Sequence, residues 1–217
     1  MIDTQLLISS LLTGISVIMA LTFHEFSHGY VSYLLGDSTA KQSGRLTLNP
    51  LKHLDLIGAI CLFVFKFGWA KPVPINPNQY KHFKLGTVLT SLAGPFSNIL
   101  FAFVALLVYG ILITFTDLKD SHYLIVFLQI LVSLNLGLAV FNLLPIPPLD
   151  GSKVLFALLP QRAYDFVLTY ERYGFIVLVI LLLTNVLDNF LFTGVNSIIR
   201  FLLLPVNAIV RWIAGLL

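Results

Sequence analysis

Long apolar runs constrain what this chain can fold into more than any other feature of its sequence. No charged residue occurs between Ile8 and Phe23. A helix that crosses the hydrocarbon core of a bilayer, about 30 Å thick, needs about 20 predominantly apolar residues. Only 11% of the 217 residues are charged, whereas an ordinary soluble domain has roughly 25%. The sequence therefore predicts a polytopic membrane protein and excludes an ordinary soluble domain.

We expect an all-α membrane protein with about five transmembrane helices. The apolar runs place them at about Leu6–Leu35, Leu85–Thr116, Tyr123–Leu143, Tyr173–Leu187 and Phe190–Ala214. Arg200 and Pro205 interrupt the last run, so we expect that helix to be broken or to lie along the interface. No linker separates domains, so residues 1–217 are predicted to form one membrane-embedded domain, with a core at 6–160 and accessory helices at 161–217.

Basic residues predict the orientation of the chain in the membrane. Lysine and arginine are concentrated in residues 36–84 and 150–172, and such loops face the cytoplasm. The N-terminus should then lie outside an integral protein of the cell membrane. The first helix lacks the basic flank and cleavage site of a signal peptide, so we expect it to be retained. Topology accounts for the basic residues, so no nucleic-acid partner is expected.

A short apolar stretch lies between the first two predicted spans. Leu56–Phe67 is apolar but too short to span a bilayer, and it is rich in β-branched and aromatic residues. Prolines punctuate the chain from Gly68 to Pro77, which favours extended backbone. We expect a short re-entrant extended or β segment here, buried in protein or lining a wet cavity.

Near the end of the first predicted span stands the sequence His24-Glu25-Phe26-Ser27-His28. Histidines four residues apart on a helix project from one face and can share a metal ion, usually Zn²⁺. Glu25 is rotated about 100° from His24, within reach of a water on that metal. The pattern predicts a metal-dependent hydrolase, with Glu25 as its base. The alternative is a set of polar residues that face the bundle interior without a metal.

A catalytic zinc site typically has three protein ligands, and Asp150 is the candidate third one. It follows three prolines, at positions 145, 147 and 148, that end the third predicted span. The predicted topology brings Asp150 to the same side of the membrane as His24 and His28. The alternative is a turn carboxylate, because Asp-Gly is a common turn dipeptide.

The chain resembles the site-2 protease family of intramembrane zinc metalloproteases, in a small form without a PDZ domain. Three motifs carry the resemblance: His24-Glu25-x-x-His28, Gly94-Pro95-Phe96-Ser97-Asn98, and Asn142-x-x-Pro145-x-Pro147-Pro148-Leu149-Asp150-Gly151. It implies one Zn²⁺ bound by His24, His28 and Asp150, Glu25 as general base, and cleavage within or near substrate transmembrane helices. It also implies that the proline-rich stretch after Gly68, with Pro72 and Asn76, engages substrate as a strand.

Further residues are weaker candidates for the site. Asn142 could donate a hydrogen bond to a developing oxyanion, or it could satisfy the end of its helix. Asn98 could contact a neighbouring segment or substrate, while Gly94-Pro95 could simply kink the helix. His53 could face substrate or lie in an interfacial loop.

Two other functions remain open from the residues alone. A transporter or channel could use histidine and aspartate at membrane depth, and an inactive scaffold could hold membrane partners. For a protease, the expected partners are the lipid bilayer and single-span membrane proteins. The resemblance suggests anti-sigma factors or membrane-held transcription regulators, and remnant signal peptides are another possibility.

Overall fold

The structure is a computed structural model that describes residues 4–55, 57–58, 69–118, 122–160 and 173–216. Within these ranges the chain is helical, without a named strand; an isolated antiparallel bridge joins Leu54 to Ala70. The helices are α1 (Thr4–Leu34), α2 (Thr39–Gln42), η1 (Pro50–Lys52), η2 (Pro77–Gln79), α4 (Phe83–Phe115), α5 (Tyr123–Asn142), α6 (Asp150–Leu158) and α8 (Asp188–Ala214). A further helical stretch covers Tyr173–Leu183.

Four helices of the described chain are long and apolar enough to cross a membrane: α1, α4, α5 and α8. The first three lie within two residues of their predicted bounds. A span was predicted at Tyr173–Leu187, but the described helix ends at Leu183, because Asn185 has a φ of 54°. Asparagine tolerates this left-handed conformation, which ends a helix. The helix α8 then begins at Asp188 and continues through Pro205.

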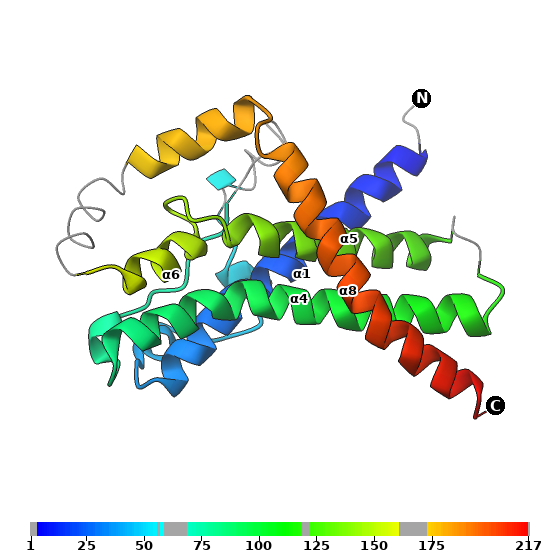
Figure 1. Ribbon diagram of the computed structural model, residues 1–217, viewed down its shortest axis with the longest axis horizontal. Coiled ribbons are helices and arrows are strands. Elements are labelled where there is room, and N and C mark those ends of the chain that lie inside the picture. The colour runs from blue at the N-terminus through cyan, green and yellow to red at the C-terminus, as the bar shows by residue number, and fades with distance from the viewer. Residues whose placement is uncertain (1–3, 56, 59–68, 119–121, 161–172, 217) are drawn as a thin grey trace.

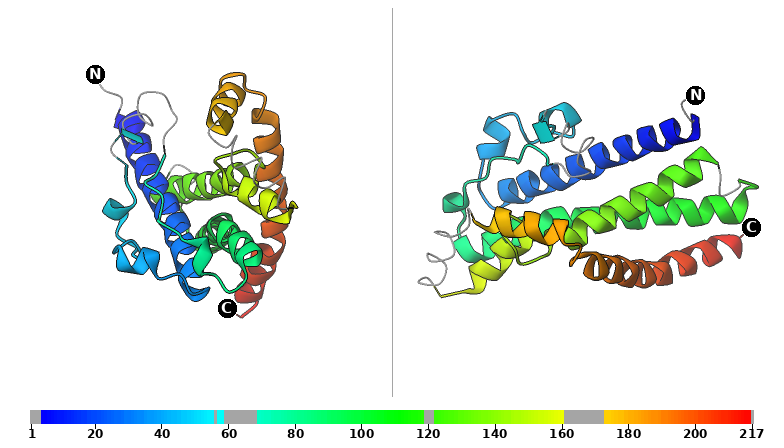
Figure 2. Two further views of the ribbon diagram at one scale, coloured as in Figure 1. Left: turned by 90° about the vertical axis from the view of Figure 1, so that its left-hand side faces the viewer. Right: turned by 90° about the horizontal axis from the view of Figure 1, so that it is seen from above.

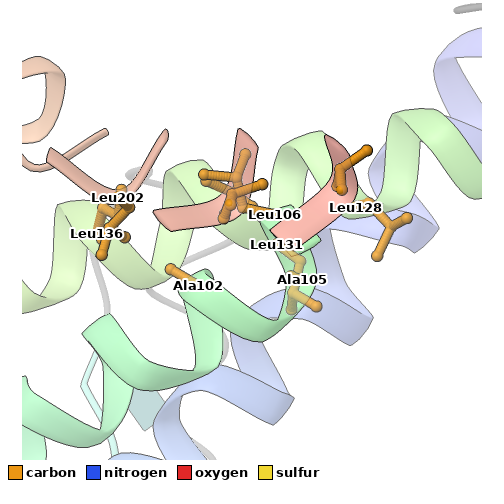
Figure 3. Packing of buried hydrophobic residues seen from close by; sticks show 10 residues of the cluster. Ala102, Ala105, Leu106, Leu128, Leu131, Leu136 and Leu202 are labelled. Atoms are coloured by element: carbon orange, nitrogen blue, oxygen red, sulfur yellow. The ribbon is translucent and has the colours of Figure 1, made fainter. Parts of the chain in front are cut away.

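Close packing between α4, α5 and α8 forms the apolar core. In Figure 1, α4 and α5 lie side by side, and α8 crosses them obliquely. Figure 3 shows Ala102 and Ala105 of α4 packed among leucines of α5 and α8. Lipid chains are as apolar as leucine, so helices associate in a membrane largely through close contact at small residues. The two alanines let the three helices approach.

The two ends of the molecule contain different parts of the chain. The N-terminus of α1 and the C-terminal ends of α4 and α8 lie at the right-hand end of Figure 1 and of the right-hand view of Figure 2. The C-terminal end of α1, the start of α4 and helix α6 lie at the opposite end. His24 and His28 belong to the C-terminal part of α1, so they lie towards that opposite end.

A segment that we call the strap (residues 70–76) lies outside regular secondary structure. Its Lys71 N–H donates to the carbonyl of His53, 2.9 Å away. The Arg45 guanidinium donates to the carbonyls of Lys71 at 2.7 Å and Pro72 at 3.2 Å. Residues 70–76 form no helix and no named strand, and the prediction of an extended or re-entrant segment stays a prediction. Most of the predicted re-entrant segment Leu56–Phe67 lies outside the described residues.

Asp37 anchors the other end of the strap to the end of α1. Its buried carboxylate accepts hydrogen bonds from Asn76 N–H at 2.7 Å, Thr39 N–H at 2.9 Å and the Ser32 hydroxyl at 2.8 Å. Burial raises the pKa of Asp37, but hydrogen bonds from Thr39, Asn76 and Ser32 outweigh it and lower the pKa below its usual value. The charged carboxylate therefore stabilises the folded chain.

Substituting Asp37→Asn should destabilise the protein by about 1–3 kcal/mol at neutral pH, because the new amide would point hydrogens at buried donors. A group with a lowered folded pKa contributes stability above its unfolded pKa, near 3.9, and loses it as the pH falls through the folded pKa. The difference from wild type should therefore shrink below about pH 4. Thermal unfolding in detergent across pH measures this.

Asp117→Asn is the matched control, since that carboxylate is exposed and should change stability little. A constant difference between Asp37→Asn and wild type from pH 7 to pH 3 would contradict the assigned role of Asp37.

Candidate metal centre

Three buried side chains from two distant parts of the chain converge on one point. The Nε2 atoms of His24 and His28 lie 3.0 Å apart. The Oδ2 atom of Asp150 lies 3.2 Å from Nε2 of His24 and 3.1 Å from Nε2 of His28. The helix α1 supplies both histidines one turn apart, and Asp150 is the first residue of α6. The structure thus brings together the three residues predicted as metal ligands.

The hydrogen bonds on the far side of each imidazole determine which nitrogen carries the proton. Nδ1 of His28 lies 2.6 Å from the carbonyl oxygen of Thr90, which can only accept. Nδ1 of His24 lies 2.7 Å from Oδ1 of Asn98. The Asn98 amide is oriented by its NH₂ group, which donates to Ala20 O and Asn135 Oδ1. In their neutral forms both imidazoles therefore carry their proton on Nδ1, and both Nε2 lone pairs face Asp150.

Two nitrogen lone pairs and a carboxylate oxygen that meet without a hydrogen between them repel one another unless a cation lies there. Tetrahedral Zn²⁺ with ligand bonds near 2.0–2.1 Å separates its ligand atoms by about 3.3 Å. The observed separations of 3.0–3.2 Å fit such an ion. The donor set, two imidazoles and one carboxylate, is also that of catalytic zinc sites with three protein ligands.

The remaining oxygen of Asp150 has its own partner. Nζ of Lys153, one turn further along α6, lies 3.3 Å from Oδ1, which leaves Oδ2 for the histidines. Burial raises the pKa of Asp150, but the charge of His28, when that residue is protonated, and the charge of Lys153 lower it well below its usual value. Asp150 is therefore an anion, as a metal ligand must be.

A cavity of about 400 Å³ opens beside the three ligands. Glu25, Asn142 and Lys153 line it, together with Val73 and Ile75 of the strap. The Glu25 carboxylate accepts a hydrogen bond from Val73 N–H at 2.8 Å. Asn142 donates to the carbonyl of Leu138, one turn back in α5. The predicted base and the predicted oxyanion donor thus share one cavity with the metal ligands.

The other predicted site residues are spread more widely. Asn98 is fully buried and bonds to His24. Pro72 lines the cavity, while Asn76 caps η2 by accepting from Asn78 N–H. His53 is buried and away from the cavity lining, with Nε2 bonded to the carbonyl of Thr47. Gly68 lies outside the described residues.

Sequence reasoning missed two residues that support the ligands. Thr90 acts through its main-chain carbonyl, and any residue type provides that group. Asn135 is fully buried in α5 and accepts from Asn98. The sequence could have indicated Asn135, because burying an asparagine inside an apolar span costs free energy and such residues are usually functional.

Comparisons with known proteins agree with this geometry. The family model described as Peptidase family M50 matches residues 110–187, which include Asp150. "Putative zinc metalloprotease YwhC" of Bacillus subtilis is 44% identical over 191 residues, covering 84% of this chain and 85% of the relative. "Putative zinc metalloprotease Rip2" of Mycolicibacterium smegmatis is 32% identical over 182 residues, covering 81% of this chain and 68% of the relative. The chain belongs to peptidase family M50.

Membership in family M50 and the ligand geometry together identify a zinc-dependent metalloprotease. The M50 match, read with the four long apolar helices, also establishes an integral membrane protein. The resemblance to the site-2 protease family and the assignment of zinc are thus confirmed. No solved structure gave a significant match.

Gly94 of α4 lies directly against the metal ligands. A Cβ atom there would lie 2.5 Å from both Cε1 of His24 and Nε2 of His28. Both rings are fixed by the hydrogen bonds on their Nδ1 atoms, so neither can move aside cheaply. The substitution Gly94→Ala should therefore abolish stoichiometric zinc binding, measured as metal content of the purified protein.

Gly137→Ala is the matched control, because a Cβ at this helical position meets nothing within 4 Å. It should keep one zinc per chain and wild-type thermal stability. Full zinc occupancy in Gly94→Ala would contradict the close approach of α4 to the ligands.

Asn98 fixes the tautomer of His24, so Asn98→Ala should weaken zinc binding by about 10–100-fold, the usual effect of losing a partner of a ligating histidine. Competition with a chelator of known affinity measures this change. Asn207→Ala on the exposed face of α8 is the control and should leave the affinity unchanged. An unaltered affinity in Asn98→Ala would mean that the ring orientation is set elsewhere.

Proposed function

We propose that this protein is an intramembrane endopeptidase that hydrolyses a peptide bond within or near a transmembrane helix of its substrate. One observation carries the proposal: a three-ligand metal centre and the Glu25 carboxylate, which is not one of the ligands, share a cavity beside a helix of membrane-spanning character. Ionisable groups at such positions are costly and functional by default.

The residues take distinct roles in this proposal. His24, His28 and Asp150 bind the ion, and Asn98 and the Thr90 carbonyl orient the two imidazoles. A bound Zn²⁺ acidifies water and polarises a substrate carbonyl. Glu25 is the general base and holds the transferred proton. The Asn142 amide has two hydrogens and uses one on Leu138, so the second can stabilise an oxyanion.

Hydrolysis within a helix requires local unwinding, since a helix engages and shields its own peptide groups. An unwound stretch at membrane depth must find new hydrogen-bond partners. A strand edge provides them by β-augmentation. We infer that the segment Leu56–Pro77 supplies this edge; the antiparallel bridge between Leu54 and Ala70 and the lack of a helix in the strap support the inference.

The substrates of this proposal are single-span membrane proteins. Anti-sigma factors, membrane-held transcription regulators and remnant signal peptides fit that class. The basic loops favour an N-terminus outside the cell membrane and a catalytic cavity towards the cytoplasm. That orientation would give water a short polar path to the cavity.

The substitution Glu25→Gln tests the function. It should lower cleavage by about 10²–10⁴-fold, the usual contribution of a general base, and leave zinc content unchanged because the ligands are intact. The measurement uses purified zinc-loaded protein with a panel of synthetic single-span peptides, each carrying helix-destabilising residues near one end. Cleavage products are identified by mass spectrometry.

Asp188→Asn removes an exposed carboxylate far along the chain and should cleave like wild type. Equal cleavage by Glu25→Gln and wild type would exclude Glu25 as the base. Zinc transport into liposomes without any cleavage would favour a transporter instead.

A further inference from the structure

The strap has few main-chain N–H donors, and three of them have described acceptors. Pro72 and Pro74 have no N–H, so the donors in residues 71–76 belong to Lys71, Val73, Ile75 and Asn76. Lys71 donates to His53, and Asn76 donates to Asp37. Val73 donates to Glu25. Among the described hydrogen bonds, Ile75 N–H has no acceptor.

Val73 and Ile75 are the two donors that an incoming strand could use. In extended chain, residues two apart direct their N–H groups to the same side. Val73 N–H points to Glu25, and both residues line the cavity beside the metal ligands. A substrate strand that pairs with this side of the strap therefore needs the hydrogen that Glu25 now accepts.

The position of the strap against α1 is tightly defined. Val73 is 5% exposed, and its Cγ1 atom would lie 3.1 Å from a Cβ atom added at Gly29. Gly29 follows the ligand His28 directly, so the absence of a side chain there lets the strap pack beside the metal centre. Arg45 and Asp37 hold the two ends of the strap. The strap therefore keeps Val73 N–H in place while its acceptor changes.

We propose that Val73 N–H is a substrate-binding group, and that in the free protein the Glu25 carboxylate accepts its hydrogen bond. This inference rests on the proposed function. A substrate carbonyl displaces the Glu25 carboxylate from this donor, and the displaced carboxylate becomes available as the base. Substrate binding and release of the base are then one exchange of hydrogen-bond acceptors. The exchange needs no movement of the strap's anchors.

The first test compares two inactive variants, Glu25→Ala and Glu25→Gln, both loaded with zinc. The Gln carbonyl can still accept from Val73 N–H, whereas Ala leaves that donor free. A single-span peptide that the wild type cleaves, labelled with a fluorophore, should bind Glu25→Ala several-fold more tightly than Glu25→Gln. Equal affinities would overturn the proposal.

A larger cavity in Glu25→Ala could also tighten binding, so a second substitution isolates the hydrogen bond. Replacing Val73 by the corresponding α-hydroxy acid turns the amide between Pro72 and residue 73 into an ester. The ester lacks the N–H, while the isopropyl side chain still packs against Gly29. In this background the two variants at position 25 should bind the peptide equally. A difference that persists in the ester background would also overturn the proposal.

The contact in the free protein has a separate readout. With ¹⁵N-valine labelling and no peptide, the Val73 amide proton resonance should move upfield in Glu25→Ala, where it loses a carboxylate acceptor. An unmoved resonance would show that Glu25 does not hold this group. Failure of the proposed function itself looks different: the wild type would then cleave none of the peptides, while the Val73 resonance would still report the contact.

Discussion

The structure depends on one electrostatic constraint, the meeting of two imidazole lone pairs and a carboxylate oxygen within 3.2 Å of one another. Contacts from α1 and α4 support this arrangement. The helix α1 sets the spacing of the histidines, Gly94 lets α4 approach their rings, and the Asn98 and Thr90 oxygens hold their protons on the far side. Without a positive charge between them the three atoms would repel one another, so a metal ion bound here would stabilise the folded chain.

Much of this site could be predicted from the sequence because its geometry is local or topological. The four-residue spacing of His24 and His28 fixes their common face on any helix. Asp150 could be placed because prolines end a span just before it. The partners of the ligands could not be predicted in the same way. The contact from Thr90 is a main-chain carbonyl, and the orientation of Asn98 depends on Asn135 from a third helix.

The fold, like the site, could be predicted only in part. Apolar run length predicted α1, α4 and α5 within two residues, because the bilayer sets how long a spanning helix must be. It placed the end of the helix at Tyr173–Leu183 four residues too late, because apolar composition continues through the left-handed Asn185 that ends this helix. Hydropathy measures the environment of a segment and is insensitive to a single backbone conformation. The prolines of the strap account for its lack of a helix, since proline restricts the residue before it, but the contact of the strap with Glu25 could not be predicted.

The metal centre and the strap also share a hydrogen-bond chain whose direction is fixed. Asp37 is an acceptor, so the Ser32 hydroxyl donates to it and must accept from the Tyr80 hydroxyl, 2.8 Å away. Tyr80 in turn accepts from the hydroxyl of Thr90, 3.0 Å away. The carbonyl of Thr90 accepts from His28, and Asp37 also accepts from Asn76 of the strap. A single buried carboxylate thus orders both the strap, our proposed substrate-binding segment, and the residue that orients a ligand, so disturbing Asp37 should affect both together.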